Sequence, residues 1–229
     1  MTAETLFQRQ LDYIFDRPTT TEPAWYFTEF WQKSDEAIFP YDNHEVVFAF
    51  MENLLKNAGK YLEIYSNDQI GLGFNYIFNN SCSNMTHDIR EADVPFDRKI
   101  SLLENLFSLF KEVFNERCLT ETSAYAAVLS PPLNNICYMF WDVTPLSYWG
   151  NIPKTERKDY YEAIAMVMQR CLSLKNPACV ESGLHGLGHM VSEQPNIAVP
   201  IIDAFLAKPK NPSSKIIKYA KQARTGMIL

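Results

Sequence analysis

The residues whose types and spacing could do chemistry are one carboxylate and two histidines in the C-terminal third of the chain. Glu181, His185 and His189 follow one another at intervals of four residues. On a helix, residues four apart point in nearly the same direction, so these three would form one polar stripe. A carboxylate and two imidazoles suit zinc or iron. The spacing therefore makes these residues candidate metal ligands.

The stripe lacks the rest of the metalloprotease motif. In that motif a Glu directly follows the first His as the general base, and Gly186 stands at this position. Any further ligand would come from another part of the chain, with Cys179, Glu193, Asp203 and His87 as the candidates. Neither a metal ion nor another cofactor is predicted, and no residue is predicted to be catalytic.

The alternative role of the stripe is structural, and it is the one that we expect. Four small residues on the same segment would let another helix approach closely: Ser182, Gly183, Gly186 and Gly188. His185 and His189 would then hydrogen-bond to neighbouring backbone or to carboxylates at helix ends. A catalytic histidine that works without a metal is a third interpretation.

A second group of polar residues lies in an apolar segment. Trp141 and Asp142 follow Asn134, Asn135 and Tyr138 on a stretch that is hydrophobic nearly all round. A buried carboxylate needs a partner, so we expect Asp142 to cap a helix or to pair with a Lys or Arg. An acid beside a Trp could instead be a general acid with a raised pKa.

Composition favours one well-packed helical domain. The 229 residues are 47% hydrophobic and 14% aromatic, with only 8 Gly to make the tight turns of a β protein. The formal net charge is -6 and no Lys/Arg run stands out, which argues against a nucleic-acid partner. The acidity is compatible with a basic protein partner, and it also keeps a protein soluble.

The cysteines and the N-terminus favour a bacterial cytoplasmic location. There are 5 Cys without a CxxC pair, and the start of the chain lacks a basic, apolar leader. No stretch is long and apolar enough to span a bilayer, so we expect no membrane association. The cysteines are expected to be reduced and mostly buried.

Hydrophobic periodicity, prolines and capping residues predict the helices. The expected ranges are 2–15, 24–31, 44–58, 66–78, 95–117, 133–143, 156–174, 178–193, 197–206 and 213–226, with 81–94 as a loop. Ser66 to Gln69 reads as a capping box, Thr155 and Ser213 as N-caps, and Gly59 as a helix end. The segment 24–31 is aromatic enough to be a strand instead.

The residues after Arg157 resemble the helical hairpins of HEAT and armadillo repeats in helix length and in their prolines at turns. A repeat period of about 40 residues is not evident, so a non-repeating helical bundle is the competing architecture. The fold class is therefore all-α, a bundle or α-α superhelix. We expect one domain over 1–229, with a division at 130/131 as the alternative.

The segment from Ala178 to His189 also resembles a stretch of bacterial proteins, some of which belong to toxin–immunity neighbourhoods. This resemblance implies a non-enzymatic protein that binds another protein, such as an immunity protein that covers the active site of a toxin. The alternatives are a metal-binding protein or metal-dependent enzyme that uses Glu181, His185 and His189, and a scaffold or oligomerisation module. The sequence indicates no oligomeric state.

Overall fold

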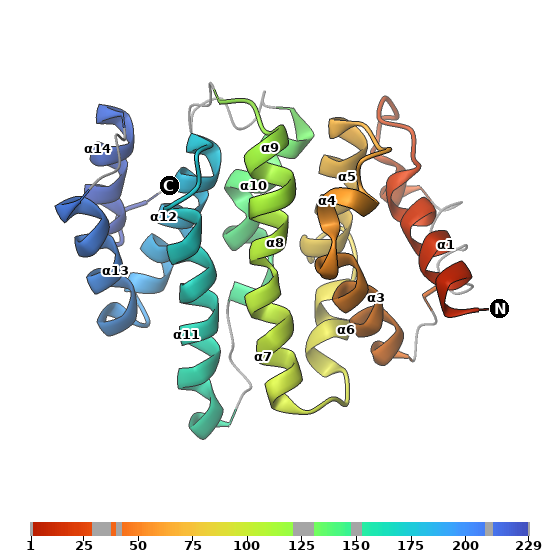
Figure 1. Cartoon of the computed structure of the whole chain (residues 1–229), viewed down its shortest axis with the longest axis horizontal. Helices are drawn as coiled ribbons and strands as arrows, with labels where there is room; N and C mark the ends of the chain where they lie inside the picture. Colours follow the sequence, from red (N-terminus) through yellow and green to blue (C-terminus); the bar gives the residue numbers. More distant parts are fainter. Residues whose placement is uncertain are drawn as a thin grey trace.

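The protein is built from packed helices, as predicted. The computed structural model describes residues 2–28, 38–39, 43–120, 131–147, 153–208 and 213–228, and none of these residues lies in a strand. In Figure 1 the helices stand side by side in chain order, from α1 at one end to α13 and α14 at the other. The all-α fold class is confirmed, while the division into domains stays a prediction.

The N-terminal elements are α1 (Ala3–Phe15), the 3-10 turn η1 (Trp25–Phe27), α3 (His44–Lys56), α4 (Ala58–Tyr61), α5 (Asn67–Phe78) and α6 (Met85–Glu91). Three of them, α1, α3 and α5, begin at side chains that accept a backbone hydrogen bond. Thr2 caps α1 and Asn43 caps α3. Ser66 and Gln69 form the predicted capping box at the start of α5, because each side chain accepts from the backbone of the other.

Three local predictions in this half were wrong or fall partly outside the described residues. The helix expected over 24–31 is only the short turn η1, and residues 29–31 lie outside the described ranges. Gly59 does not end a helix, since α3 ends at Lys56 with Asn57 as its C-cap, and Gly59 lies within α4. The loop expected over 81–94 contains α6, whose buried Met85 and Ile89 belong to the core.

The middle of the chain forms a long helical run and one buried helix. The run comprises α7 (Phe96–Asn105), α8 (Phe107–Leu109), the π-helical turn η3 (Phe110–Phe114) and α9 (Asn115–Arg117). This agrees with the helix predicted over 95–117, apart from the change in hydrogen bonding near Leu106. The buried helix is α10 (Pro132–Val143), followed by the turn η5 (Pro145–Ser147).

The C-terminal helices are α11 (Lys154–Cys171), α12 (Pro177–Val191), α13 (Pro195–Ala207) and α14 (Ser214–Ala223). Ser213 caps α14 as predicted, by accepting from the backbone N–H of Ile216. Thr155 was predicted to cap α11, and this was wrong because Pro153 occupies the cap position. Gly226 follows α14 with a φ of +72°, in the left-handed region that favours glycine.

Small residues bring the central helices into close contact. A Cβ built on Gly71 of α5 would lie 2.3 Å from the backbone nitrogen of Leu133 in α10. A Cβ on Gly183 of α12 would lie 2.7 Å from the carbonyl oxygen of Met168 in α11. The predicted close approach of another helix to the glycines of α12 is therefore confirmed, and it fixes α12 against its neighbours.

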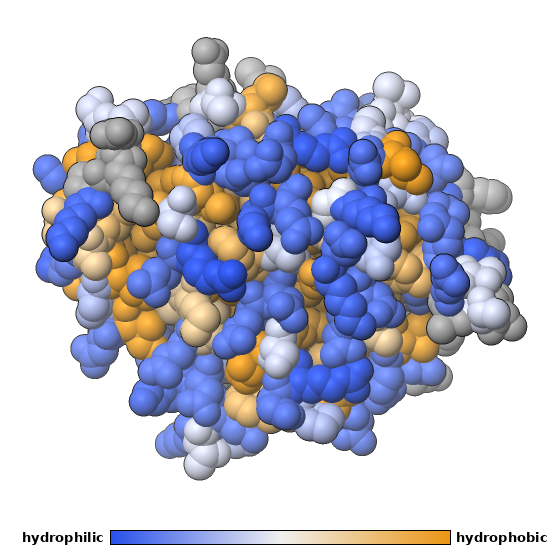
Figure 2. All heavy atoms as spheres, in the orientation of Figure 1, coloured by the Kyte–Doolittle hydropathy of each residue, from blue (hydrophilic) through white to orange (hydrophobic). Residues whose placement is uncertain are grey.

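The face of the molecule drawn in Figure 2 is mainly polar. On this face hydrophobic residues gather toward the end formed by α13 and α14. At that end Ile197, Ile201 and Phe205 of α13 are only partly buried against the core. Within the described ranges, none of the helices is long and apolar enough to cross a lipid bilayer.

Candidate functional site

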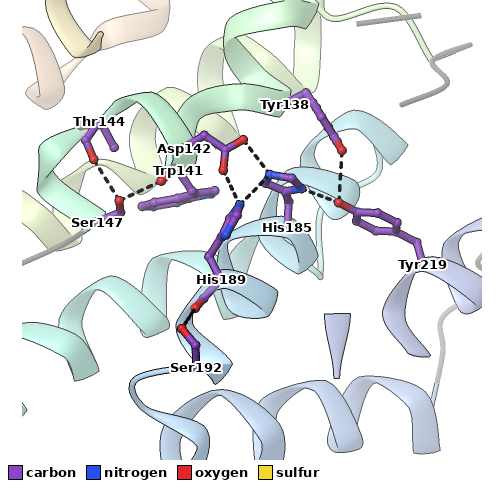
Figure 3. Close-up of polar contacts among 9 residues, drawn as sticks. All are labelled: Tyr138, Trp141, Asp142, Thr144, Ser147, His185, His189, Ser192 and Tyr219. Carbon is purple, nitrogen blue, oxygen red and sulfur yellow. Dashed lines mark hydrogen bonds and ion pairs between the residues drawn. The ribbon is translucent and has the colours of Figure 1, made fainter. Parts of the chain in front are cut away.

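One carboxylate from α10 and two imidazoles from α12 converge on a single point (Figure 3). Nε2 of His185 lies 2.7 Å from Oδ2 of Asp142 and 3.1 Å from Nε2 of His189. His189 Nε2 also contacts the other carboxylate oxygen, Oδ1, of Asp142. The three potential ligand atoms all lie within 4.8 Å of one another.

Local structure explains why these side chains meet. His185 and His189 are one turn apart on α12, so they project from the same face of that helix. Asp142 lies in the last turn of α10, which packs against α12. Gly186 allows this contact, since a Cβ on it would lie 2.6 Å from Cγ of Trp141.

The site is closed on one side and accessible on the other. The side chain of His185 is 1% exposed, that of Asp142 is 20% exposed and that of His189 is 48% exposed. His185 therefore forms the floor of the site, and His189 stands at its opening to solvent.

Two tyrosines close the site behind His185. Nδ1 of His185 is hydrogen-bonded to the hydroxyl of Tyr219 on α14, whose oxygen lies 3.3 Å from that of Tyr138 on α10 (Figure 3). The rings of Tyr219 and His185 are parallel, with their centroids 6.2 Å apart. These contacts fix the ring of His185, so its Nε2 points toward Asp142.

The carboxyl group of Asp142 is more acidic than usual. Burial alone would raise its pKa, but hydrogen bonds and charge from His185 and His189 outweigh this effect and lower the pKa to about 2. Asp142 is therefore a carboxylate at neutral pH and offers negatively charged oxygens to the site. The lowered pKa contradicts the alternative in which Asp142 is a general acid with a raised pKa.

A pocket of about 300 Å³ opens beside the site. Asp142 and His189 belong to its lining, together with Trp141 and Met190. Glu193 also lines it, and its Oε2 accepts a hydrogen bond of 2.7 Å from the hydroxyl of Tyr161. The converging ligand atoms are thus next to a space large enough for a small molecule.

The structure brings together only part of the predicted stripe. His185 and His189 are in the site, whereas the buried Glu181 faces Lys215 of α14, with 4.0 Å between Oε1 and Nζ. Burial raises the pKa of Glu181, and the charge of Lys215 partly offsets this. The third member of the cluster is Asp142, which was expected to cap a helix or to pair with a Lys or Arg and instead contacts two histidines.

The other suggested ligands lie in different surroundings. Glu193 is in the neighbouring pocket, and Asp203 of α13 pairs with Arg224. Cys179 is buried, and its thiol donates to the carbonyl of Phe110 at 3.7 Å. His87 is exposed on α6. The expected hydrogen bonds from the histidines to a carboxylate are present.

Tyr219 is the residue of the site that the sequence analysis missed. It was overlooked among the apolar residues of its helix, although it lies three residues after Ile216 and four before Ala223, both of which are buried. That spacing places it on the inner face of α14. A tyrosine on an inner face needs a hydrogen-bond partner, so this position was a detectable signal.

Comparisons with known proteins identify no relative. No protein-family model, curated protein or solved structure matches this chain. The chemistry of the site therefore has to be argued from its own geometry.

Proposed function

We propose that this protein binds a divalent transition-metal ion through Asp142, His185 and His189. The observation that carries the proposal is the mutual contact of two Nε2 atoms and one carboxylate within 4.8 Å. Two imidazole nitrogens bound to one zinc ion, each at about 2.0–2.1 Å, lie roughly 2.9–3.4 Å apart. The 3.1 Å between the Nε2 atoms of His185 and His189 falls within this range.

Hydrogen bonds alone do not account for all three contacts. An Nε2 that donates its proton to Asp142 has no lone pair left to accept from the other ring. An Nε2 that instead accepts from the other ring carries no proton, so it has none to donate to the nearby carboxylate. The nitrogen lone pair and the negatively charged oxygen then repel each other. One cation would satisfy all three groups at once, because each would then act as an electron-pair donor.

The surroundings also suit a metal ligand. Metal-binding histidines usually donate their second ring N–H to a neighbouring acceptor, which fixes the tautomer. Nδ1 of His185 has such a partner in the hydroxyl oxygen of Tyr219, and Tyr219 can in turn donate to Tyr138. Two nitrogen ligands and one oxygen ligand favour zinc or iron(II) over calcium or magnesium, which prefer oxygen.

Metal titration of the untagged, chelator-treated protein tests the proposal. We expect one Zn²⁺ or Co²⁺ per chain by calorimetry and elemental analysis, and at least about 100-fold weaker binding for His189→Asn. The matched control is His44→Asn, because His44 also contacts a carboxylate, that of Asp88, at 2.9 Å, but within the described ranges this pair belongs to no group of three potential metal ligands. Absence of stoichiometric Zn²⁺, Co²⁺ and Fe²⁺ binding, or equal weakening by both variants, would refute the proposal.

The function expected from the sequence stays a prediction beside this proposal. The packed helices are compatible with a HEAT-like repeat, and such surfaces commonly bind other proteins. A bacterial immunity protein that covers a toxin, or a scaffold, could hold the metal as a structural element. Co-purification with the product of a neighbouring gene tests toxin binding, and sizing experiments test self-association.

A further inference from the structure

The pocket beside the metal-ligand cluster lies on its open side. Of the three residues in the cluster, Asp142 and His189 also line the pocket, whereas His185 does not. Tyr138 and Tyr219 cover His185 from behind (Figure 3). A metal ion held by the three residues would therefore face the pocket with whatever coordination positions the protein leaves free.

The number of ligands indicates that such positions exist. Structural zinc sites are usually closed by four protein ligands, while catalytic sites use three and keep one position for water or substrate. The described residues supply one group of three potential ligands here, and no other His, Cys, Asp or Glu within those ranges joins it. The arrangement corresponds to the open type of site.

The chemistry of the pocket wall limits what can bind there. Trp141, Met168 and Met190 supply apolar surface to the lining. Asp142 and Glu193 supply negative charge, and none of the described lining residues is Lys or Arg. The two positive charges of the metal ion would be offset by Asp142 and Glu193, and a phosphate or another polyanion would find no Lys or Arg among these residues to hold it. A neutral molecule with a small apolar group is therefore favoured.

We propose that the pocket binds a small organic molecule that is neutral in solution and coordinates the metal through an oxygen atom of the carbonyl or hydroxamic acid class. Its apolar part lies against Trp141, Met168 and Met190. The hydrogen-bonded pair Tyr161–Glu193 supplies polar groups to the lining. This inference rests on the metal-binding function proposed above.

The cobalt(II)-loaded protein provides the test, because its visible absorption reports the coordination of the metal. Acetohydroxamic acid and benzohydroxamic acid should each produce a saturable change in the spectrum while the metal stays bound. Benzohydroxamic acid should bind at least about fivefold more tightly, since its ring buries more apolar surface in the pocket. Inorganic phosphate should bind more weakly than either.

A charge-reversal variant tests the role assigned to the pocket wall. Glu193→Lys should raise the affinity for phosphate roughly tenfold, because it replaces a repelling charge by an attracting one. Asp159→Lys is the matched control, since Asp159 is exposed on α11 and does not line the pocket. If both variants gain the same affinity for phosphate, the charge of Glu193 is not what disfavours phosphate in the pocket.

The outcomes separate this inference from the proposal that it rests on. A protein that binds no cobalt refutes the metal-binding function itself. A protein that holds cobalt but shows no spectral change with either hydroxamic acid has a closed, structural site, and the inference is then wrong. Phosphate binding tighter than hydroxamic acid binding refutes the proposed ligand class.

Discussion

The carboxylate of Asp142 lies 2.7 Å from Nε2 of the almost fully buried His185, and it joins the end of α10 to the middle of α12. The same carboxylate contacts His189 one turn later. Two helices from different parts of the chain are thus linked through one acidic side chain. Both the packing of the site and the proposed metal binding therefore depend on Asp142.

Replacing Asp142 by Asn should separate these two roles. In metal-free protein we expect a loss of about 1–3 kcal/mol in the free energy of unfolding, because a buried charge-assisted pair is broken. Zn²⁺ at about 100 times its Kd should stabilise the wild type by about 2.7 kcal/mol, and the variant by much less. Urea unfolding with and without Zn²⁺ measures both effects. Equal stabilisation of the two proteins by Zn²⁺ would remove Asp142 from the metal site.

Tyr219→Phe should weaken metal binding without removing a ligand. The hydroxyl of Tyr219 is the partner of His185 Nδ1, and loss of such a partner typically costs 10–100-fold in metal affinity. Tyr138→Phe is the control, since it keeps the ring that packs against His185, with centroids 4.6 Å apart, and removes the hydroxyl, which lies 3.3 Å from that of Tyr219. Competition with a chelator of known affinity measures both values. A larger loss of metal affinity for Tyr138→Phe than for Tyr219→Phe would mean that the hydroxyl of Tyr219 is not the partner that fixes His185.

Local features of this fold could be predicted from the sequence, because they depend on residues close together in the chain. The capping box of Ser66 and Gln69 needs only four residues, and the proline at the start of α12 fixes its own helical position. The loop predicted over 81–94 failed for the opposite reason. Helix α6 there is short and polar, and its stability comes from Met85 and Ile89 packing in the core.

The site could be predicted only in part. The spacing of His185 and His189 indicated a shared helical face, and both residues are in the cluster. The third member of the group was predicted to be Glu181 on the same helix. The spacing of residues in a sequence indicates which side chains are neighbours along one helix, but not which helices contact each other. The approach of α10 depends on Gly186 accommodating Trp141, a tertiary relationship that no spacing rule contains.

Gly186→Ala should therefore disturb both stability and the site. A Cβ at this position would lie 2.6 Å from Trp141 Cγ and 2.7 Å from Met168 Cε, so one of these side chains must move. We expect a loss of about 1–3 kcal/mol in the free energy of unfolding and weaker metal binding. Gly59→Ala is the control, because the nearest atom to its Cβ, Cβ of Glu112, lies 3.2 Å away. Its effect should stay within about 1 kcal/mol.

The cysteines provide a test of the core that does not involve the metal. Cys118, Cys137, Cys171 and Cys179 are buried as free thiols, and Cys82 is only partly buried. Burial raises the pKa of Cys82, and it raises those of Cys137 and Cys171 far more strongly. Because the thiolate is the reactive form, a raised pKa slows labelling.

We therefore expect native protein to react with a thiol reagent at one site, slowly, and unfolded protein to react at all five. Cys82→Ser should abolish the reaction of the native state and leave four reactive thiols in the unfolded state. A reagent that releases a coloured product on reaction measures the number of reactive thiols in each state from the absorbance at pH 8. Fast labelling of Cys137 or Cys179 in the native state would show that α10 and α12 are not packed as the structure has them, since these two cysteines lie on these helices.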